Sequence, residues 1–126
     1  MIRLKKFSYQ TNTTKSKYKN KKTVINGLKF DSKKEGMRYL DLLEKLNLGQ
    51  ISGLELQPQF ELQPKYKKDG KTIRALVYKA DFAYYDKDGN YIVEDVKGSK
   101  YCLTDHYKIK KKIFEYKYPY KIKEIY

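Results

Sequence analysis

The sequence predicts a mixed α/β (α+β) domain in which the elements follow the order helix, three strands, helix, strand. Apolar residues recur at helical spacing in two segments, and four other segments have the patterns of strands. The helical segments span residues 32–47 and 104–117, and the strand segments span residues 54–62, 72–85, 91–97 and 120–126. A length of 126 residues suits one such domain, and no internal repeat or linker divides it.

The charge of the chain narrows the class of partner. Its formal net charge of +14 favours a polyanion, most simply nucleic acid. A membrane surface is the competing partner, but the sequence has no long apolar run and no signal-like segment. We therefore expect no membrane association and a location in the cytoplasm.

The low number of cysteine and histidine residues excludes several kinds of site. Cys102 is the single cysteine, so no internal disulfide can form. His106 is the single histidine, which excludes a zinc finger and a histidine-based metal site. Carboxylates then remain as the metal ligands, and their oxygen atoms suit magnesium or manganese.

The N-terminal residues form a basic segment of their own. Residues 1–22 hold eight Lys or Arg and no acid, and apolar periodicity is absent after Phe7. This composition predicts a flexible arm, which either contacts DNA or is a solvated terminus. A single domain is expected over residues 23–126. It begins with a hairpin over residues 23–30, because Asn-Gly lies there between two short apolar runs.

The first helix carries a carboxylate on its apolar side. Ser32 is positioned to cap this helix and Gly49 to end it. Glu35 lies within the stripe of apolar residues, one turn before Tyr39. Two interpretations of Glu35 stay open. Its side chain either reaches back to the Ser32 backbone in a capping box, or is a carboxylate delivered onto the sheet beside Asp81.

The two strands that flank the turn at residues 86–90 carry the strongest chemical pattern. Asp81 lies on the first strand, and Asp95 and Lys97 lie two apart on the second, so that these two share a face. Two carboxylates on adjacent strands can share a divalent metal, and a lysine beside them can stabilise an anion, which is the chemistry of metal-assisted phosphodiester hydrolysis. The alternative is a surface ion pair, but two nearby carboxylates repel each other without a cation. Glu94 should face the other way and is interpreted either as structural or as a residue that supports the metal ligands from behind.

Two further stretches complete the expected fold. Pro58, within the strand over residues 54–62, indicates an edge strand or a bulge. Residues 65–71, around Asp69-Gly70, are expected to form a charged loop.

The second helix is expected to be apolar on one side and basic on another. Thr104 can cap it. Its expected apolar face comprises Ile109, Ile113 and Tyr116, and its basic arc comprises Lys108, Lys111 and Lys112. The arc is either solvated or a DNA-contacting surface. DNA contact is favoured, because the helix starts soon after Lys97 and both helix N-termini and lysines attract phosphate.

At these residues the sequence resembles the PD-(D/E)XK nuclease superfamily. The run from Tyr78 to Phe82 resembles its first acidic motif, although Ala80 stands where proline is usual, and Asp95-Val96-Lys97 matches its acid-x-lysine motif. Glu35 matches a glutamate that several members carry on the leading helix. The resemblance runs from about residue 30 to residue 126. It implies a restriction-endonuclease-like core of a helix, three antiparallel strands, a helix and a fourth strand.

Within the superfamily, the sequence is most similar to small phage and prophage proteins that share its Asp-Ser-Lys-Lys-Glu helix start and its Glu-Asp-Val-Lys-Gly strand end. It is also similar to the nuclease subunit of Tn7-like transposases and to phage junction-resolving endonucleases. These relatives imply cleavage of DNA that leaves a 5′-phosphate and a 3′-hydroxyl.

The resemblance also implies a cofactor and roles for the site residues. The cofactor is Mg²⁺, for which Mn²⁺ can substitute. Asp81 and Asp95 would hold the metal, and Glu35 would complete its coordination or bind a second ion. Lys97 would orient or deprotonate the attacking water, or stabilise the developing charge.

Residues and resemblance together predict a magnesium-dependent DNA endonuclease that is selective for branched DNA, as a Holliday junction resolvase is, and that acts in phage DNA recombination inside a bacterial host cell. We expect a homodimer, because cutting two strands needs two sites. Two alternatives stay open. One is a nuclease for linear or nicked DNA in transposition, packaging or defence, and the other is a non-catalytic DNA-binding protein.

Overall fold

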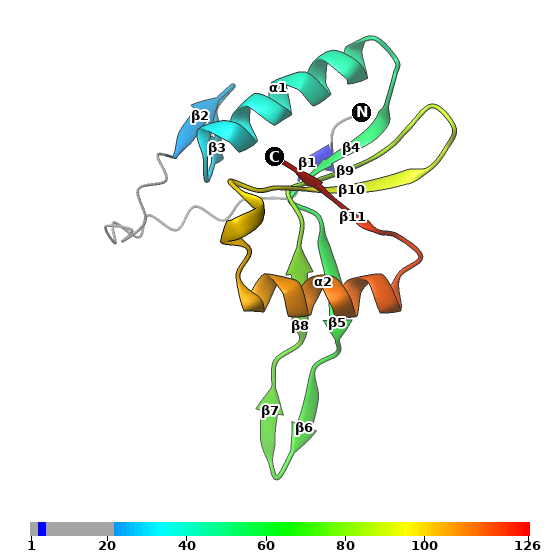
Figure 1. The fold of residues 1–126 in the computed structure, drawn as a ribbon. Coiled ribbons are helices and arrows are strands. Elements are labelled where there is room, and N and C mark those ends of the chain that lie inside the picture. The colour runs from blue at the N-terminus through cyan, green and yellow to red at the C-terminus, as the bar shows by residue number, and fades with distance from the viewer. Residues whose placement is uncertain (1–2, 5–21) are drawn as a thin grey trace.

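The computed structural model describes residues 3–4 and 22–126, and it has the mixed α+β architecture that the sequence predicts. Two helices cover opposite faces of a five-stranded sheet (Figure 1). The sheet has the strand order β1-β4-β9-β10-β11. These elements are α1 (Lys33–Asn47), α2 (Asp105–Lys117), β1 (Arg3–Leu4), β4 (Ser52–Leu56), β9 (Phe82–Tyr85), β10 (Tyr91–Val96) and β11 (Ile122–Ile125).

The sheet is mixed in direction. The central strand β9 pairs antiparallel with both β4 and β10. At the two edges, β1 pairs parallel with β4 and β11 pairs parallel with β10. From α1 onward, the strands of this sheet and the two helices that cover it follow one another along the chain as α1, β4, β9, β10, α2 and β11. That order matches the predicted helix, three strands, helix and strand.

Alternation along the central strands builds a separate core on each face of the sheet. On β9, Phe82 and Tyr84 belong to the cluster under α1, whereas Ala83 belongs to the cluster under α2. The α1 face also buries Tyr39 and Leu42 from the helix itself. Because β9 and β10 are covered on both sides, any charged side chain on them must find a partner or line an opening.

The ends of both helices form as predicted from local signals. The Ser32 hydroxyl accepts a hydrogen bond of 3.1 Å from the third residue of α1, and the Thr104 hydroxyl does the same for α2, also at 3.1 Å. Gly49 follows α1 with φ at +72°, the left-handed conformation that ends many helices. The predicted leading hairpin is present as β2 (Thr23–Ile25) and β3 (Leu28–Phe30).

Two segments expected to be single strands are each broken, which corrects the prediction. The strand over residues 54–62 divides into β4 and β5 (Gln59–Gln63), and the strand over residues 72–85 divides into β7 (Lys71–Ile73), β8 (Leu76–Lys79) and β9. The breaks at Gln57 and Asp81 lie opposite each other, because the Gln57 N–H donates to the Asp81 carbonyl at 2.9 Å. Gln57 has φ at +51°, so the paired strands turn together, and Asp81 lies at a bend.

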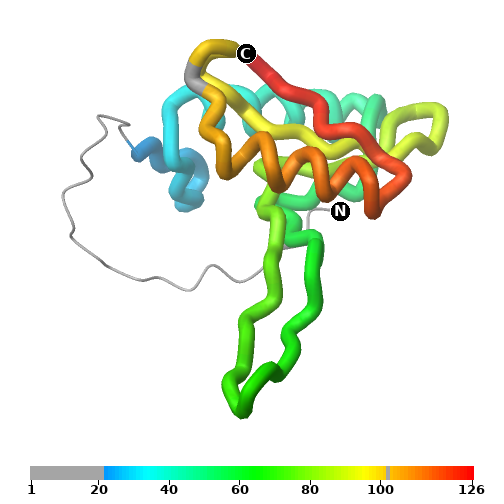
Figure 2. Tube along the Cα trace, turned by 60° about the horizontal axis from the view of Figure 1, so that its bottom comes forward, coloured from blue at the N-terminus to red at the C-terminus, as the bar shows by residue number. Residues whose placement is uncertain are grey.

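The charged loop expected over residues 65–71 is instead a β-hairpin. β6 (Tyr66–Lys68) pairs antiparallel with β7, and Asp69 and Gly70 form its turn with φ values of +51° and +73°. Asp-Gly is a favoured two-residue hairpin turn, and it outweighs the polar character of the flanking strands. Figure 2 shows the hairpin projecting away from the body of the molecule.

The second helix turns a different face toward the sheet than its sequence predicts. Tyr107 and Phe114 are buried, whereas Ile109 and Tyr116 are 58% and 93% exposed. The predicted apolar face is therefore wrong at Ile109 and Tyr116, whereas Ile113 packs against the core as predicted. The large aromatic side chains occupy the buried positions, and Phe114 packs edge-on against Phe60 with ring centroids 5.0 Å apart.

The predicted flexible arm over residues 1–22 falls almost entirely outside the described residues. Within it, Arg3 and Leu4 form β1, in register with Glu55 and Leu56 of β4. None of the described helices is both long enough and apolar enough to cross a membrane.

Candidate active site

A cleft of about 360 Å³ opens where the start of α1, the bend before β9 and the end of β10 meet. The cleft is lined by nine residues from these three places: Asp31, Ser32, Lys34, Glu35, Asp81, Asp95, Val96, Lys97 and Gly98. The structure thus brings together all four residues that the sequence singles out for chemistry: Glu35, Asp81, Asp95 and Lys97.

Asp81 owes its position to the bend between β8 and β9. Its Oδ2 accepts a hydrogen bond of 2.7 Å from the Val96 N–H, which ties the bend to the end of β10. Burial, then the charges of Glu35 and Asp95, raise the pKa of Asp81 to about 8, and the Val96 N–H offsets part of this rise.

Asp95 is held from two sides near the end of β10. The Tyr78 hydroxyl donates to its Oδ2 at 2.6 Å, and the Lys97 ammonium lies 3.1 Å from its Oδ1. Burial, followed by the charge of Asp95, raises the pKa of Tyr78, so that Tyr78 remains a neutral donor. Tyr78 begins the run that resembles the first acidic motif, but a tyrosine on a strand gives no local sign of a carboxylate partner.

Lys97 follows β10 directly and is positioned by an aromatic ring as well as by Asp95. Its Nζ lies 3.5 Å from the centroid of the Tyr107 ring on α2. The Tyr107 hydroxyl in turn donates to Glu124 on β11 at 2.8 Å. Asp95 and Lys97 therefore share the α2 side of the sheet, as the alternation predicts, while Val96 packs against the α1 core.

Glu35 is almost completely buried, with 4% of its surface exposed. The Ser32 hydroxyl caps its N–H, which is one half of the expected capping box. Its Oε1 is buried and has no hydrogen-bond partner among the described residues. Burial and the negative charge of Asp31 raise the pKa of Glu35 to about 7, with a smaller contribution from Asp95. An oxygen buried without a partner is costly, and this favours the interpretation of Glu35 as part of the cleft.

Glu94 faces away from the cleft and is fully buried, as its structural interpretation requires. Arg38 on α1 forms two hydrogen bonds with its carboxylate, at 2.8 and 2.6 Å, and the Tyr84 hydroxyl donates to the same group. This paired geometry compensates the buried charge and fixes α1 over β10.

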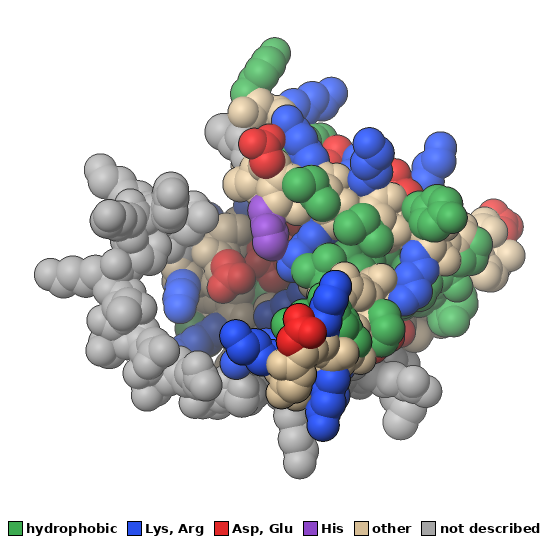
Figure 3. Space-filling view, turned by 90° about the horizontal axis from the view of Figure 1, so that it is seen from below, with side chains coloured by type: hydrophobic (Ala, Val, Ile, Leu, Met, Phe, Trp, Pro, Cys, Tyr) green, Lys and Arg blue, Asp and Glu red, His purple; other side chains and the backbone are tan. Residues whose placement is uncertain are grey.

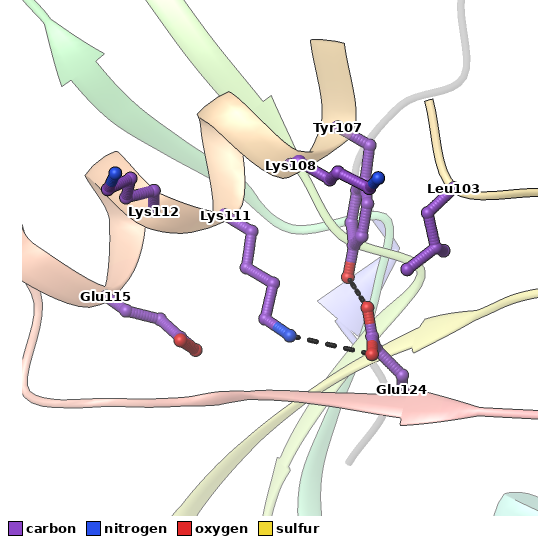
Figure 4. A pocket seen from close by; sticks show the side chains of 7 residues that line it. All are labelled: Leu103, Tyr107, Lys108, Lys111, Lys112, Glu115 and Glu124. Atoms are coloured by element: carbon purple, nitrogen blue, oxygen red, sulfur yellow. Dashed lines mark hydrogen bonds and ion pairs between the residues drawn. The ribbon is translucent and has the colours of Figure 1, made fainter. Parts of the chain in front are cut away.

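The three lysines expected to contact DNA lie along α2 beside the Glu124 carboxylate (Figure 4). Lys111 points toward Glu124, with 3.5 Å between its Nζ and Oε1. Lys112 points away from Glu124, and both Lys108 and Lys112 are exposed. The geometry therefore leaves Lys108 and Lys112 free to meet an external anion, whereas Lys111 would have to give up its contact with Glu124.

The cleft suits a hard divalent cation in the kind of donor that it offers. Its acidic side chains are carboxylates, whose oxygen atoms such cations prefer. Glu35 has an oxygen without a partner among the described residues, and the pKa values of Glu35 and Asp81 are raised. Across the described ranges, however, no three Asp, Glu, His or Cys side chains are grouped tightly enough to hold an ion together. Mg²⁺ needs no such cage, because it keeps several waters and binds through one or two carboxylates.

The raised pKa values predict how the stability of the metal-free protein depends on pH. Above about pH 5 the folded protein retains protons that the unfolded chain has released, on Glu35 up to about pH 7 and on Asp81 up to about pH 8. Their contribution to the free energy of unfolding therefore falls as the pH rises through this window. Asp81→Asn should raise stability at the upper end and flatten the pH dependence. Urea unfolding in the presence of a chelator, repeated across this pH range, measures the free energy of unfolding. An unchanged pH dependence in Asp81→Asn would contradict the raised pKa of Asp81.

Comparisons with known proteins place the chain in a family. A family model described as "Protein of unknown function (DUF1064)" matches residues 15–125. No curated protein and no solved structure matches the chain.

Proposed function

Since this chain belongs to the DUF1064 family, whose description assigns no function, we propose a function from its site: a magnesium-dependent DNA endonuclease that is selective for branched DNA. One observation carries the proposal. Glu35, Asp81, Asp95 and Lys97 converge on one cleft, and burial together with neighbouring carboxylates raises the pKa of Glu35 and of Asp81. Strongly shifted pKa values in a cleft are typical of functional sites.

Each residue of the cleft takes a role in this proposal. Asp81 and Asp95 would hold the metal, and the free oxygen of Glu35 would complete its coordination or hold a second ion. When bound, Mg²⁺ supplies a Lewis acid for the phosphate and lowers the pKa of a water. Tyr78 fixes the orientation of Asp95 through its 2.6 Å hydrogen bond. Lys97 carries a positive charge beside these acids and can donate hydrogen bonds to a phosphate oxygen.

The same cleft argues against a protein that only binds DNA. A net charge of +14 already attracts the phosphate backbone. Clustered carboxylates at the point where phosphate approaches oppose that attraction unless a cation lies between them. Binding gains nothing from Asp81, Asp95 and Glu35 in one place, whereas metal-dependent hydrolysis needs them. The proposed DNA-contacting residues are Lys108, Lys111 and Lys112, which lie together on α2.

The preference for branched DNA is proposed from the charge of the chain, whose formal net value is +14. Lysine contacts with the DNA backbone position a protein without reading sequence. Selectivity then comes from the shape and deformability of DNA, and a branch point offers both. A homodimer would place two clefts on opposed strands of a four-way junction.

This preference is tested by cleavage of linear, flap, fork and four-way DNA of matched sequence in the presence of Mg²⁺. We expect forks or junctions to be cut at lower enzyme concentration than linear duplex, with paired nicks near the branch. Equal cutting of linear duplex would overturn the branched preference and leave the nuclease assignment intact. Absence of cleavage on every substrate would overturn the nuclease assignment itself.

A further inference from the structure

The hairpin that projects from the body has no evident role in the core. We define the hairpin arm as residues 65–74, which comprise β6, β7 and the residues that flank them. Every residue of the arm is exposed. Figures 1 and 2 both show it extending away from the sheet and the helices. A two-stranded ribbon exposed to solvent adds little to the stability of the fold. The arm is therefore a candidate binding surface.

The charge of the arm indicates a polyanionic partner. The arm holds five cations and one acid: Lys65, Lys67, Lys68, Lys71, Arg74 and Asp69. Its register sets Lys68 directly opposite Lys71, and like charges in this position destabilise a strand pair. The ion pairs between described residues join Arg38 with Glu94, Lys97 with Asp95 and Lys111 with Glu124, so none involves the arm. Figure 3, with the arm toward the viewer, shows Lys and Arg side chains spreading around an acidic one.

The shape of the arm fits a DNA groove. Two paired strands lie about 4.8 Å apart, and the major groove, about 12 Å wide, admits a two-stranded ribbon. Tyr66 and Ile73 pair across the arm on the face that also carries Lys68 and Lys71. This apolar pair, 43% and 38% exposed, stiffens the ribbon behind its charged tip.

The ribbon of β5 and β8 from which the arm extends is anchored to α2. Lys110 on α2 donates to the Val77 carbonyl of β8 at 2.9 Å. The Tyr78 and Phe114 rings pack with centroids 5.4 Å apart, and Phe60 on the adjacent β5 joins the same aromatic cluster. An anchored ribbon loses little conformational entropy on binding.

The arm is also within reach of a duplex bound at the cleft. Ile73 and Asp81 are eight positions apart in the chain, so at about 3.3 Å per residue they are at most roughly 26 Å apart. At 3.4 Å per base pair this corresponds to about eight base pairs. One duplex can therefore meet the cleft and the arm together.

We propose that the hairpin arm enters the major groove of the DNA whose backbone occupies the cleft, and that its lysines contact the phosphates on either side of that groove. The inference rests on the DNA substrate of the proposed function and adds to it a second contact, away from the scissile phosphate. Because lysine meets phosphate as a point charge, the arm strengthens binding without reading sequence.

The test neutralises the tip and compares it with an equal change of charge elsewhere. The arm variant carries Lys67→Gln, Lys68→Gln and Lys71→Gln. The control carries Lys87→Gln, Lys117→Gln and Lys121→Gln, three exposed lysines near the opposite end of β10 and β11 from the cleft. Binding to a duplex of about 30 base pairs, long enough to span cleft and arm, is measured with a chelator over a range of salt concentrations.

We expect the arm variant to lower the log–log salt slope by roughly 0.9 for each phosphate that a lysine no longer neutralises, and to weaken binding about tenfold or more at moderate salt. The control should change both quantities much less. Thermal unfolding should be unchanged or slightly improved in the arm variant, because the facing Lys68 and Lys71 charges are removed.

Equal effects in the two variants would overturn the arm proposal, since they would reflect net charge alone. Loss of binding to anionic lipid vesicles with unchanged binding to DNA would also overturn it, in favour of a membrane surface. The outcome is separable from the proposed catalysis. If DNA binding depends on the arm but the wild-type protein cuts nothing with Mg²⁺, the arm proposal stands and the nuclease proposal falls.

Discussion

Replacing Asp95 with alanine is expected to lower Mg²⁺-dependent DNA cleavage by several orders of magnitude while the protein stays folded. Asp95 is a proposed metal ligand, and its carboxylate is already fixed by Tyr78 and Lys97 at 2.6 and 3.1 Å. Asp81→Ala and Lys97→Ala should show losses of similar size. Single-turnover cleavage with saturating enzyme measures the effect on the chemical step.

Binding of DNA should respond in the opposite sense. Removal of Asp81 or Asp95 deletes negative charge where phosphate approaches, so affinity in metal-free buffer should hold or rise. Asp88→Ala, an exposed acid in the turn before β10, is the matched control and should change neither quantity. Full activity in Asp95→Ala would contradict the site assignment, as would a marked loss of affinity in a folded variant.

Glu35→Gln is expected to separate helix capping from catalysis. The cap that the structure contains runs from the Glu35 N–H to the Ser32 hydroxyl, and the substitution leaves it in place. Gln is nearly isosteric and carries no charge, so the substitution removes the Glu35 charge that, after burial, raises the pKa of Asp81. The melting temperature in metal-free buffer should therefore be normal or higher.

Cleavage by the same variant should fall strongly, because an amide is a poorer magnesium ligand than a carboxylate. The two readouts together distinguish the roles of Glu35. Reduced melting temperature with unchanged turnover would return Glu35 to a purely structural role. Normal melting temperature with strongly reduced turnover is the expected result, and a higher Mg²⁺ requirement in the variant would assign the reduction to the metal.

Much of the fold could be predicted because its signals are local. Ser32 and Thr104 cap their helices, Asn26-Gly27 makes a hairpin turn, and Gly49 ends α1, all through contacts within a few residues. The shared face of Asp95 and Lys97 followed from the two-residue period of strands, whereas Asp81 lies at a bend that this period does not predict. Helical periodicity placed Glu35 on the sheet side of α1.

The remaining features depend on contacts between distant segments. The double break at Gln57 and Asp81 requires two strands to leave the sheet together, which neither strand signals alone. The buried face of α2 is the one that carries Phe114, which packs with Leu62 of β5 and Tyr78 of β8 in one core cluster. The carboxylate partners of Tyr78 and Arg38 lie 17 and 56 residues away in the chain, so no sequence spacing identifies them.

The central claim is that Asp81 and Asp95 form a site for a divalent cation in the cleft. Diffraction from a crystal soaked in manganese, recorded where manganese scatters anomalously, tests it most directly. The account predicts an anomalous peak bound by carboxylate oxygens of Asp81 and Asp95, with Glu35 beside it, and no such peak in crystals of Asp95→Ala. A fully soaked crystal with an empty cleft, or with its peak only at other carboxylates, would contradict the account.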